Sequence, residues 1–262
     1  MTDEPSLDVT NRFVLDFARR FEERHPGARI LDYGCGAGRL VRAARAGGLD
    51  MEGVDVFYAG SATREEAART GLLGNVIHEM MEGRMPYAAD SFDLIVNNQV
   101  MEHVEDLDAV LREIHRVLKP GGTVLSLFPA VDVFREGHIG IPFSHWMKKG
   151  SRWRFYYTWA LRSLGLGTWK EQAPTRRQWA IDKLDWIDRF TVYRTRREIF
   201  AAYDRCFSST LVEERYIRYR LLDRPGREWV VKLLRLPLVT PLAKAVFRKL
   251  AFLVILSQKE SR

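Results

Sequence analysis

The first 130 residues alternate apolar runs with helical patterns, and this alternation constrains the fold more than any other feature. From residue 29 onwards an apolar run, a turn and an amphipathic stretch follow one another repeatedly. Such alternation is typical of βαβ units, in which crossover helices join parallel strands. We therefore expect an α/β chain whose mostly parallel sheet is covered by helices on both faces, a three-layer sandwich.

The expected elements can be placed along the chain. Strands are predicted at residues 29–33, 51–56, 75–78, 92–97 and 123–129, and helices at 9–24, 39–46 and 107–118. Further on, the sequence predicts a helix near 196–205, a strand near 211–219, a short helix with Thr240 as N-cap before Pro241, and a closing strand at 250–257. Residues 131–195 lack this regularity, so we expect a helical insertion after the fifth strand. The chain is thus treated as one domain, 1–262, with a ligand-binding half (1–130), a substrate lid (131–195) and a part that completes the sheet (196–262).

Three glycines, Gly34, Gly36 and Gly38, alternate between the first strand and the next helix. Such a turn lets a ligand approach the backbone, and the helix N-terminus offers free N–H groups to it. A dinucleotide site has its third glycine where this chain has Arg39, so NAD and FAD are disfavoured. Asp55, at the end of the second strand, can accept hydrogen bonds from both hydroxyls of a ribose.

Four segments resemble motifs of the class I S-adenosylmethionine (SAM) methyltransferases, in the branch that acts mostly on small molecules. Residues 30–38 (Ile-Leu-Asp-Tyr-Gly-Cys-Gly-Ala-Gly) resemble the first motif, and 85–95 resemble the entry to the fourth strand. Residues 101–104 (Met-Glu-His-Val) and 118–122 (Leu-Lys-Pro-Gly-Gly) resemble the downstream motifs. The resemblance spans residues 28–130 and implies a Rossmann-like fold with seven strands, of which the last, around 252–256, is antiparallel.

The same resemblance implies a set of cofactor-binding residues for SAM. The turn from Asp32 to Gly38 would hold the methionine moiety, Asp55 the ribose, and Asn97 would contribute at the mouth of the fourth strand. Members of the family often place an acidic residue against the adenine, and the matching position here is Met81, with Glu82 beside it. The complete expected set is Asp32, Gly34, Cys35, Gly36, Gly38, Asp55, Met81, Glu82 and Asn97.

The charge of the chain is divided unevenly, and this bears on the acceptor, the molecule that would receive the methyl group. Residues 1–130 carry 14 Lys and Arg against 21 Asp and Glu, whereas residues 131–262 carry 27 against 13 and all seven tryptophans. Aromatic walls suit sugar rings, isoprenoids and other flat apolar bodies, and arginines suit phosphate or carboxylate. We therefore expect methyl transfer to an oxygen of an anionic, sugar-linked or lipid-linked small molecule. The alternative is that the tryptophans form the core of a small helical subdomain.

An acceptor hydroxyl would benefit from a general base, and His138 and His145 are the candidates because both follow the fifth strand. His103 lies in the family's motif and is interpreted as a contact at the start of a helix. Cys35 and Cys206 are too far apart for metal-ligand spacing, and we expect no metal. They also suggest no disulfide framework, which together with an acidic N-terminus predicts a cytoplasmic protein.

Other functions stay open at this stage. The basic, aromatic second half would permit RNA methylation, although residues 97–100 lack the Pro-Pro-aromatic element of enzymes that methylate base amino groups. A non-catalytic SAM-binding scaffold and a nicotinamide-dependent oxidoreductase are the weaker alternatives. Peripheral membrane contact could come from residues 227–248, where apolar and basic residues alternate, but Pro237 and Pro241 interrupt the helix and favour packing onto the domain.

Overall fold

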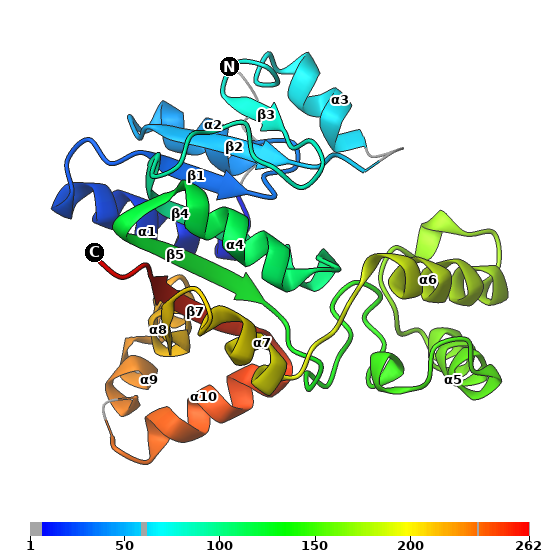
Figure 1. Ribbon diagram of the computed structural model, residues 1–262. Coiled ribbons are helices and arrows are strands. Elements are labelled where there is room, and N and C mark those ends of the chain that lie inside the picture. The colour runs from blue at the N-terminus through cyan, green and yellow to red at the C-terminus, as the bar shows by residue number, and fades with distance from the viewer. Residues whose placement is uncertain (1–6, 59–61, 235, 262) are drawn as a thin grey trace.

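The computed structural model describes residues 7–58, 62–234 and 236–261, and a seven-stranded sheet lies at its centre (Figure 1). Its strand order is β3-β2-β1-β4-β5-β7-β6. The first five strands pair in parallel, whereas β7 pairs antiparallel with both β5 and β6. The expected Rossmann-like sheet with an antiparallel last strand is confirmed. The strands are β1 (Ile30–Tyr33), β2 (Met51–Asp55), β3 (Ile77–Glu79), β4 (Phe92–Asn98), β5 (Leu118–Phe128), β6 (Ser208–Leu211) and β7 (Leu253–Gln258).

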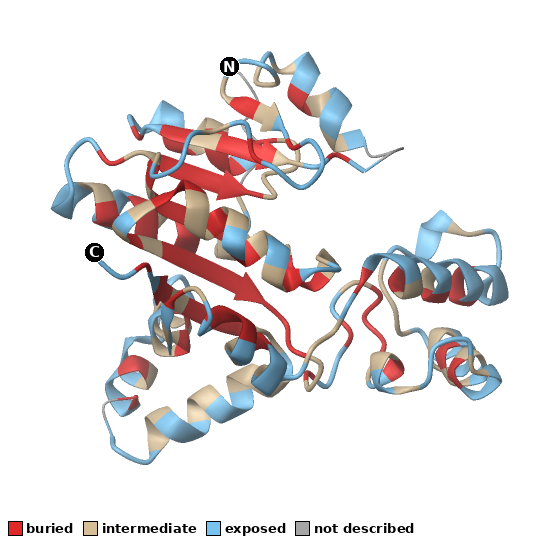
Figure 2. Cartoon of the chain, viewed as in Figure 1, coloured by how far each residue is buried: buried red, intermediate tan, exposed pale blue. Residues whose placement is uncertain are grey.

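Helices bury both faces of this sheet because successive strand residues point to opposite sides. Leu125 belongs to one buried cluster and its neighbour Val124 to the other. The first cluster includes side chains of α1 (Val9–Arg24), α2 (Arg39–Ala46), α3 (Ala62–Arg69) and α8 (Glu213–Leu222). The second includes those of α4 (Leu107–Val117) and α7 (Arg196–Tyr203). The central strands are accordingly buried along their length (Figure 2).

Helix boundaries in the first half follow local signals closely. The helix α1 begins after Asp8, whose carboxylate accepts hydrogen bonds from the backbone N–H groups of Thr10 and Asn11. Phe13, Phe17 and Phe21, at a spacing of four, are buried on its inner face. The predicted bounds of α1 and α2 are confirmed.

Two predictions for the C-terminal part are wrong. The expected strand at 211–219 is instead the end of β6 followed by α8. In the helix, the fully buried carboxylate of Glu213 accepts a hydrogen bond from the guanidinium of Arg248, with 2.6 Å between Oε1 and Nε. This contact favours the helix over the expected strand. Thr240 is not an N-cap: α10 (Val239–Leu250) begins before it, and the Thr240 hydroxyl donates to the Leu234 carbonyl. A further helix, α9, covers Glu228–Leu233.

The insertion after β5 is a helical lobe with its own core, and it projects beyond the end of that strand (Figure 1). Its helices α5 (Arg152–Ser163) and α6 (Arg176–Phe190) pack on each other, with the short turns η2 (Ser144–Trp146) and η3 (Lys170–Gln172) nearby. Trp179 is fully buried and its indole N–H donates to the carbonyl of Thr168 at 3.0 Å. Arg154, 2% exposed, donates from Nε to the Ser144 carbonyl and pairs with Asp188. Trp179 is thus core and not part of an acceptor wall.

We expect Trp179→Ala to lower the free energy of unfolding by about 3–5 kcal/mol, because it leaves a large cavity in the core of the insertion. Trp153→Ala is the matched control: Trp153 lies in the same lobe but is 79% exposed, and its loss should change stability by about 0.5 kcal/mol or less. Urea unfolding followed by circular dichroism measures both. Similar losses in the two variants would contradict a separate core built on Trp179.

Candidate functional site

The strand order reverses between β1 and β4, and ligands of open α/β sheets bind at the carboxyl ends of the strands at such a point. Two segments leave the sheet there. The glycine turn follows β1, and the turn η1 (Met101–His103) follows β4. Gln99, between β4 and η1, has a φ of 58°, which turns the chain sharply out of the sheet. The candidate site is therefore built from the loops after neighbouring strands.

The glycine turn is a close-fitting backbone cradle. Gly34, Gly36 and Gly38 all have positive φ, of 78°, 52° and 74°. A Cβ on Gly34 would lie 2.5 Å from a methyl of Val100, and one on Gly38 would collide with Ile77. Gly36 is different because, among the residues that the structure describes, its Cβ would meet only a methyl of Thr63, at 3.8 Å. The outer glycines are therefore required by packing, while Gly36 leaves space for a ligand.

Two carboxylates face this cradle. Asp55 accepts hydrogen bonds from the backbone N–H groups of Gly36 at 2.8 Å and Phe57 at 2.9 Å, which fixes its orientation. Asp32 is 5% exposed, and its burial, together with the negative charge of Asp55, raises its pKa to about 7. A buried carboxylate beside another negative charge is stabilised by a cationic ligand. The α-ammonium and sulfonium groups of SAM supply such charge, so the residues present fit this cofactor.

The remaining predicted cofactor residues are placed as follows. The Cys35 thiol is mostly buried, and burial raises its pKa, so it is a packing group and not a nucleophile. Met81, 76% exposed, and Glu82 lie in a tight turn after β3, closed by backbone hydrogen bonds between Met81 and Arg84. Asn97 is fully buried, and its amide donates to the Ser126 hydroxyl at 2.9 Å inside the sheet layer. The adenine role of Met81 and Glu82 and the donor role of Asn97 stay predictions.

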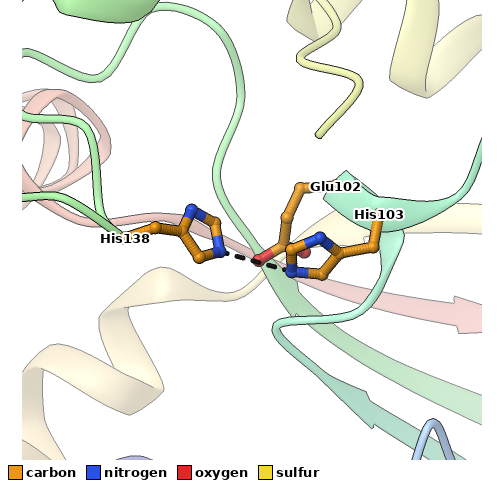
Figure 3. A group of neighbouring side chains, drawn as sticks. All are labelled: Glu102, His103 and His138. Carbon is orange, nitrogen blue, oxygen red and sulfur yellow. Dashed lines mark hydrogen bonds between the residues drawn. The ribbon is translucent and has the colours of Figure 1, made fainter. Parts of the chain in front are cut away.

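A second group, which we call the histidine cluster, lies beside the cradle and consists of Glu102, His103 and His138 (Figure 3). The first two come from η1 and the third from the loop after β5. The Nε2 atoms of the two histidines are 3.2 Å apart. His138 Nδ1 lies 2.8 Å from a carboxylate oxygen of Glu136, and His103 Nδ1 lies 2.6 Å from the Phe190 carbonyl.

Hydrogen bonding determines how protons are arranged in this cluster. A carbonyl only accepts, so His103 Nδ1 carries the hydrogen. Burial lowers the pKa of His103, which leaves its Nε2 as an acceptor. Burial also disfavours a charged His138, but the hydrogen bond and the charge of Glu136 outweigh it and raise the pKa of His138. Burial raises the pKa of Glu102 to about 7.

An aromatic wall connects the cradle to the histidine cluster. It consists of Tyr58, Phe190 and Trp186, which are 52%, 38% and 38% exposed. The ring of Phe190 lies 6.1 Å from that of Tyr58 and 5.6 Å from that of Trp186, and Trp186 lies 5.1 Å from His138. The wall thus runs from the segment after β2 through α6 to His138.

His145 differs from His138. Its Nε2 donates to the Val131 carbonyl at 3.0 Å, its Nδ1 is buried with no hydrogen-bond partner in the described part of the chain, and burial lowers its pKa. The residues to which sequence reasoning gave no role are Glu102, Glu136 and Tyr193, whose hydroxyl hydrogen-bonds Glu136. Two signals were available, the Met-Glu-His-Val motif for Glu102 and the Glu136-x-His138 spacing, whereas Tyr193 is brought in only by the folded insertion.

Comparisons with known proteins identify the family of the chain and its fold. Residues 9–177 match a family model described as a methyltransferase domain. Ubiquinone biosynthesis O-methyltransferase of Dinoroseobacter shibae is 31% identical over 157 residues, which are 57% of this chain and 63% of that protein. The enzyme of the same name from Ruegeria pomeroyi is 33% identical over 117 residues, 44% of this chain and 47% of its own length. The chain therefore spans about half to two thirds of these relatives.

A solved structure with the same fold is an S-adenosylmethionine dependent methyltransferase from Mesorhizobium loti. It superposes with a TM-score of 0.52 at 20% identity and covers 94% of this chain and 100% of its own. At this identity the likeness concerns the fold alone, and it agrees with the strand order described above.

The raised pKa of Asp32 predicts how SAM binding depends on pH. Its carboxylate form holds a cation, so the dissociation constant of SAM should fall about tenfold between pH 6 and pH 8 as Asp32 ionises. Asp32→Asn should weaken binding and remove most of this dependence. Asp50→Asn, at an exposed aspartate at the other end of β2, is the control. Calorimetric titration at several pH values measures it, and a flat profile for the unmodified chain would contradict the assignment.

Proposed function

Because the chain belongs to the methyltransferase family that its residues 9–177 match, we propose that it transfers the methyl group of SAM to an oxygen of a small-molecule acceptor. Family membership confirms the expected enzyme class and its cofactor, SAM. The observation that carries the proposal is the cradle formed by the glycine turn, Asp32 and Asp55, with a titratable cluster beside it. O-methylation is also what the curated relatives are named for.

Different residues of the chain have different roles in the proposed reaction. Bound SAM supplies a methyl group already activated on its sulfonium. Asp32 holds the cationic methionine end, and the fixed carboxylate of Asp55 accepts from the ribose hydroxyls. The acceptor oxygen forms its bond to the methyl carbon as the S–CH₃ bond breaks, with the electron pair left on sulfur. Correct positioning of the acceptor supplies most of the acceleration.

The acceptor hydroxyl must also lose its proton, and we assign this to the histidine cluster. His138 lies next to the aromatic wall, and Glu136 holds its Nδ1–H, so in the neutral ring Nε2 is the atom that takes the proton. His145 is the weaker candidate because its Nε2 donates to the Val131 carbonyl and its Nδ1 is buried, so neither nitrogen is open to an acceptor. Of the two histidines singled out from the sequence, we therefore assign the catalytic role to His138.

The acceptor is proposed to have a flat or apolar body with an anionic, sugar-linked or lipid-linked end. The aromatic wall offers exposed rings for the body. Two exposed arginines at the start of α6, Arg176 and Arg177, place positive charge on the same lobe. Guanidinium groups suit carboxylate or phosphate.

Contact with a membrane surface would suit a lipid-linked acceptor, and α10 supports it. Leu238, Leu242, Val246 and Leu250 lie at a spacing of four and are 84%, 65%, 48% and 63% exposed. Two of the basic residues expected to meet lipid, Lys244 and Arg248, instead pair with Glu213. The contact we propose is therefore mainly apolar. No helix in the described ranges is both long and apolar enough to cross a bilayer.

The proposed function is tested by transfer of radiolabelled methyl from SAM into a cell extract that is then separated into lipid, small-molecule, nucleic-acid and protein fractions. We expect label in the lipid or small-molecule fraction and its loss with Asp55→Ala, because the ribose contact disappears. His138→Asn should lower kcat by about 10²–10⁴-fold. The control His145→Asn should retain most of the activity.

Other outcomes of this assay select among the alternatives. Label in nucleic acid would replace the proposal with RNA methylation. The absence of label in every fraction, with SAM binding intact, would favour a SAM-binding scaffold.

Flotation with liposomes tests the membrane contact. The chain should float with neutral as well as anionic vesicles, because apolar contact dominates, and a Leu242→Ser, Val246→Ser double variant should float less. Both side chains are exposed, so the double variant should fold normally. Recovery of the unmodified chain only in the unbound fraction would remove this part of the proposal.

A further inference from the structure

The ligand atoms of Glu102, His103 and His138 all lie within 4.8 Å of one another (Figure 3). The two Nε2 atoms are 3.2 Å apart. Two nitrogens that each lie ~2.0–2.1 Å from a tetrahedral metal ion are separated by roughly 3.3–3.4 Å. The imidazoles are thus spaced as two ligands of one ion would be.

The carboxylate of Glu102 supplies the second, independent observation. Glu102 is 1% exposed, and both of its oxygens are buried without a hydrogen-bond partner among the described residues. Buried polar atoms in native proteins nearly always have a partner, and a lone buried carboxylate is costly. A hydrogen bond between the two histidines satisfies the rings but leaves these oxygens unsatisfied. A cation between the three side chains would satisfy all of them.

The outer contacts of the two histidines also match those of metal ligands. A ligating histidine usually donates its other ring N–H to a carbonyl or a carboxylate. His103 has the Phe190 carbonyl at 2.6 Å from Nδ1, and His138 has Glu136 at 2.8 Å. Glu136 is itself held by the Ile139 backbone N–H at 2.6 Å and by the Tyr193 hydroxyl. Both rings therefore present their Nε2 atoms inwards from fixed positions.

We propose that Glu102, His103 and His138 together bind one divalent transition-metal ion, with Zn²⁺ as the reference ion. The ion would lie where the acceptor is proposed to bind, next to the SAM site. Two imidazoles and one carboxylate suit Zn²⁺ and similar ions better than Mg²⁺. Three protein ligands leave a coordination position open. Sequence reasoning predicted no metal because it considered cysteine spacing, whereas these ligands come from segments 35 residues apart.

The open position gives the ion a role that rests on the proposed function. It would bind the acceptor's hydroxyl oxygen and lower the pKa of that hydroxyl, so that the proton leaves to solvent before the oxygen meets the methyl group. With the ion bound, His138 holds the metal through Nε2 and takes no proton itself, so this role replaces the base role given to His138 above. The binding site itself does not depend on this role.

Metal binding is tested on the full chain after dialysis against a chelator, by calorimetric titration with Zn²⁺ and elemental analysis. We expect one ion per chain, and a rise in the unfolding temperature when Zn²⁺ is added. Glu102→Ala and His138→Ala should each weaken binding by about 100-fold or more. His25→Asn, which removes an exposed histidine at the C-terminal end of α1, should bind as the unmodified chain does.

Glu102→Gln provides a variant of the same shape should the alanine variants fail to fold, and circular dichroism checks each one. Substoichiometric binding by the unmodified, folded chain, or equal affinity in all variants, would overturn the site. The proposed role of the ion in the reaction is tested separately, by measuring methyl transfer with and without Zn²⁺. Stoichiometric Zn²⁺ binding without any methyl transfer would count against the proposed function and leave the site standing, whereas transfer unchanged by a chelator would overturn the role.

Discussion

The contact between Gly34 and Val100 is the constraint on which the candidate site depends. The backbone of the glycine turn packs so closely on the Val100 side chain that a single added carbon would lie 2.5 Å from a methyl group. Val100 immediately precedes η1, which carries Glu102 and His103. This contact therefore holds the glycine turn against the segment that carries Glu102 and His103.

The sequence predicted the sheet well because the relevant forces are local and periodic. Apolar runs mark the strands, and the Asp8 cap and the Phe13, Phe17, Phe21 stripe mark α1. It failed at 211–219, where the deciding interaction, Glu213 with Arg248, joins segments 35 residues apart. The secondary-structure propensity of a short stretch of sequence carries no information about a pairing between distant residues.

The candidate site, like the fold, was predicted in part from the sequence. The cradle was predictable because Asp32 lies on β1, the glycines follow that strand directly, and Asp55 ends the neighbouring strand β2. The histidine cluster was only half visible: His138 was singled out, but its partners Glu136 and Tyr193 are assembled by the fold of the insertion. Nor did the sequence distinguish a core tryptophan such as Trp179 from an exposed one such as Trp186, because both belong to α6 and their neighbours in the sequence are similar mixtures of apolar and charged residues.

The way the insertion rejoins the sheet has a mechanical consequence. Its outgoing end is fastened to η1 by the His103 contact with Phe190, the Val192 N–H on the Glu102 carbonyl at 2.7 Å, and Arg194 on the Val104 carbonyl at 2.7 Å. This end of the insertion is therefore tied to η1, and the contact with His103 fixes the position of Phe190 in the aromatic wall. A displacement of η1 relative to the sheet would thus move Phe190 together with Glu102 and His103, the two residues of the histidine cluster that η1 carries.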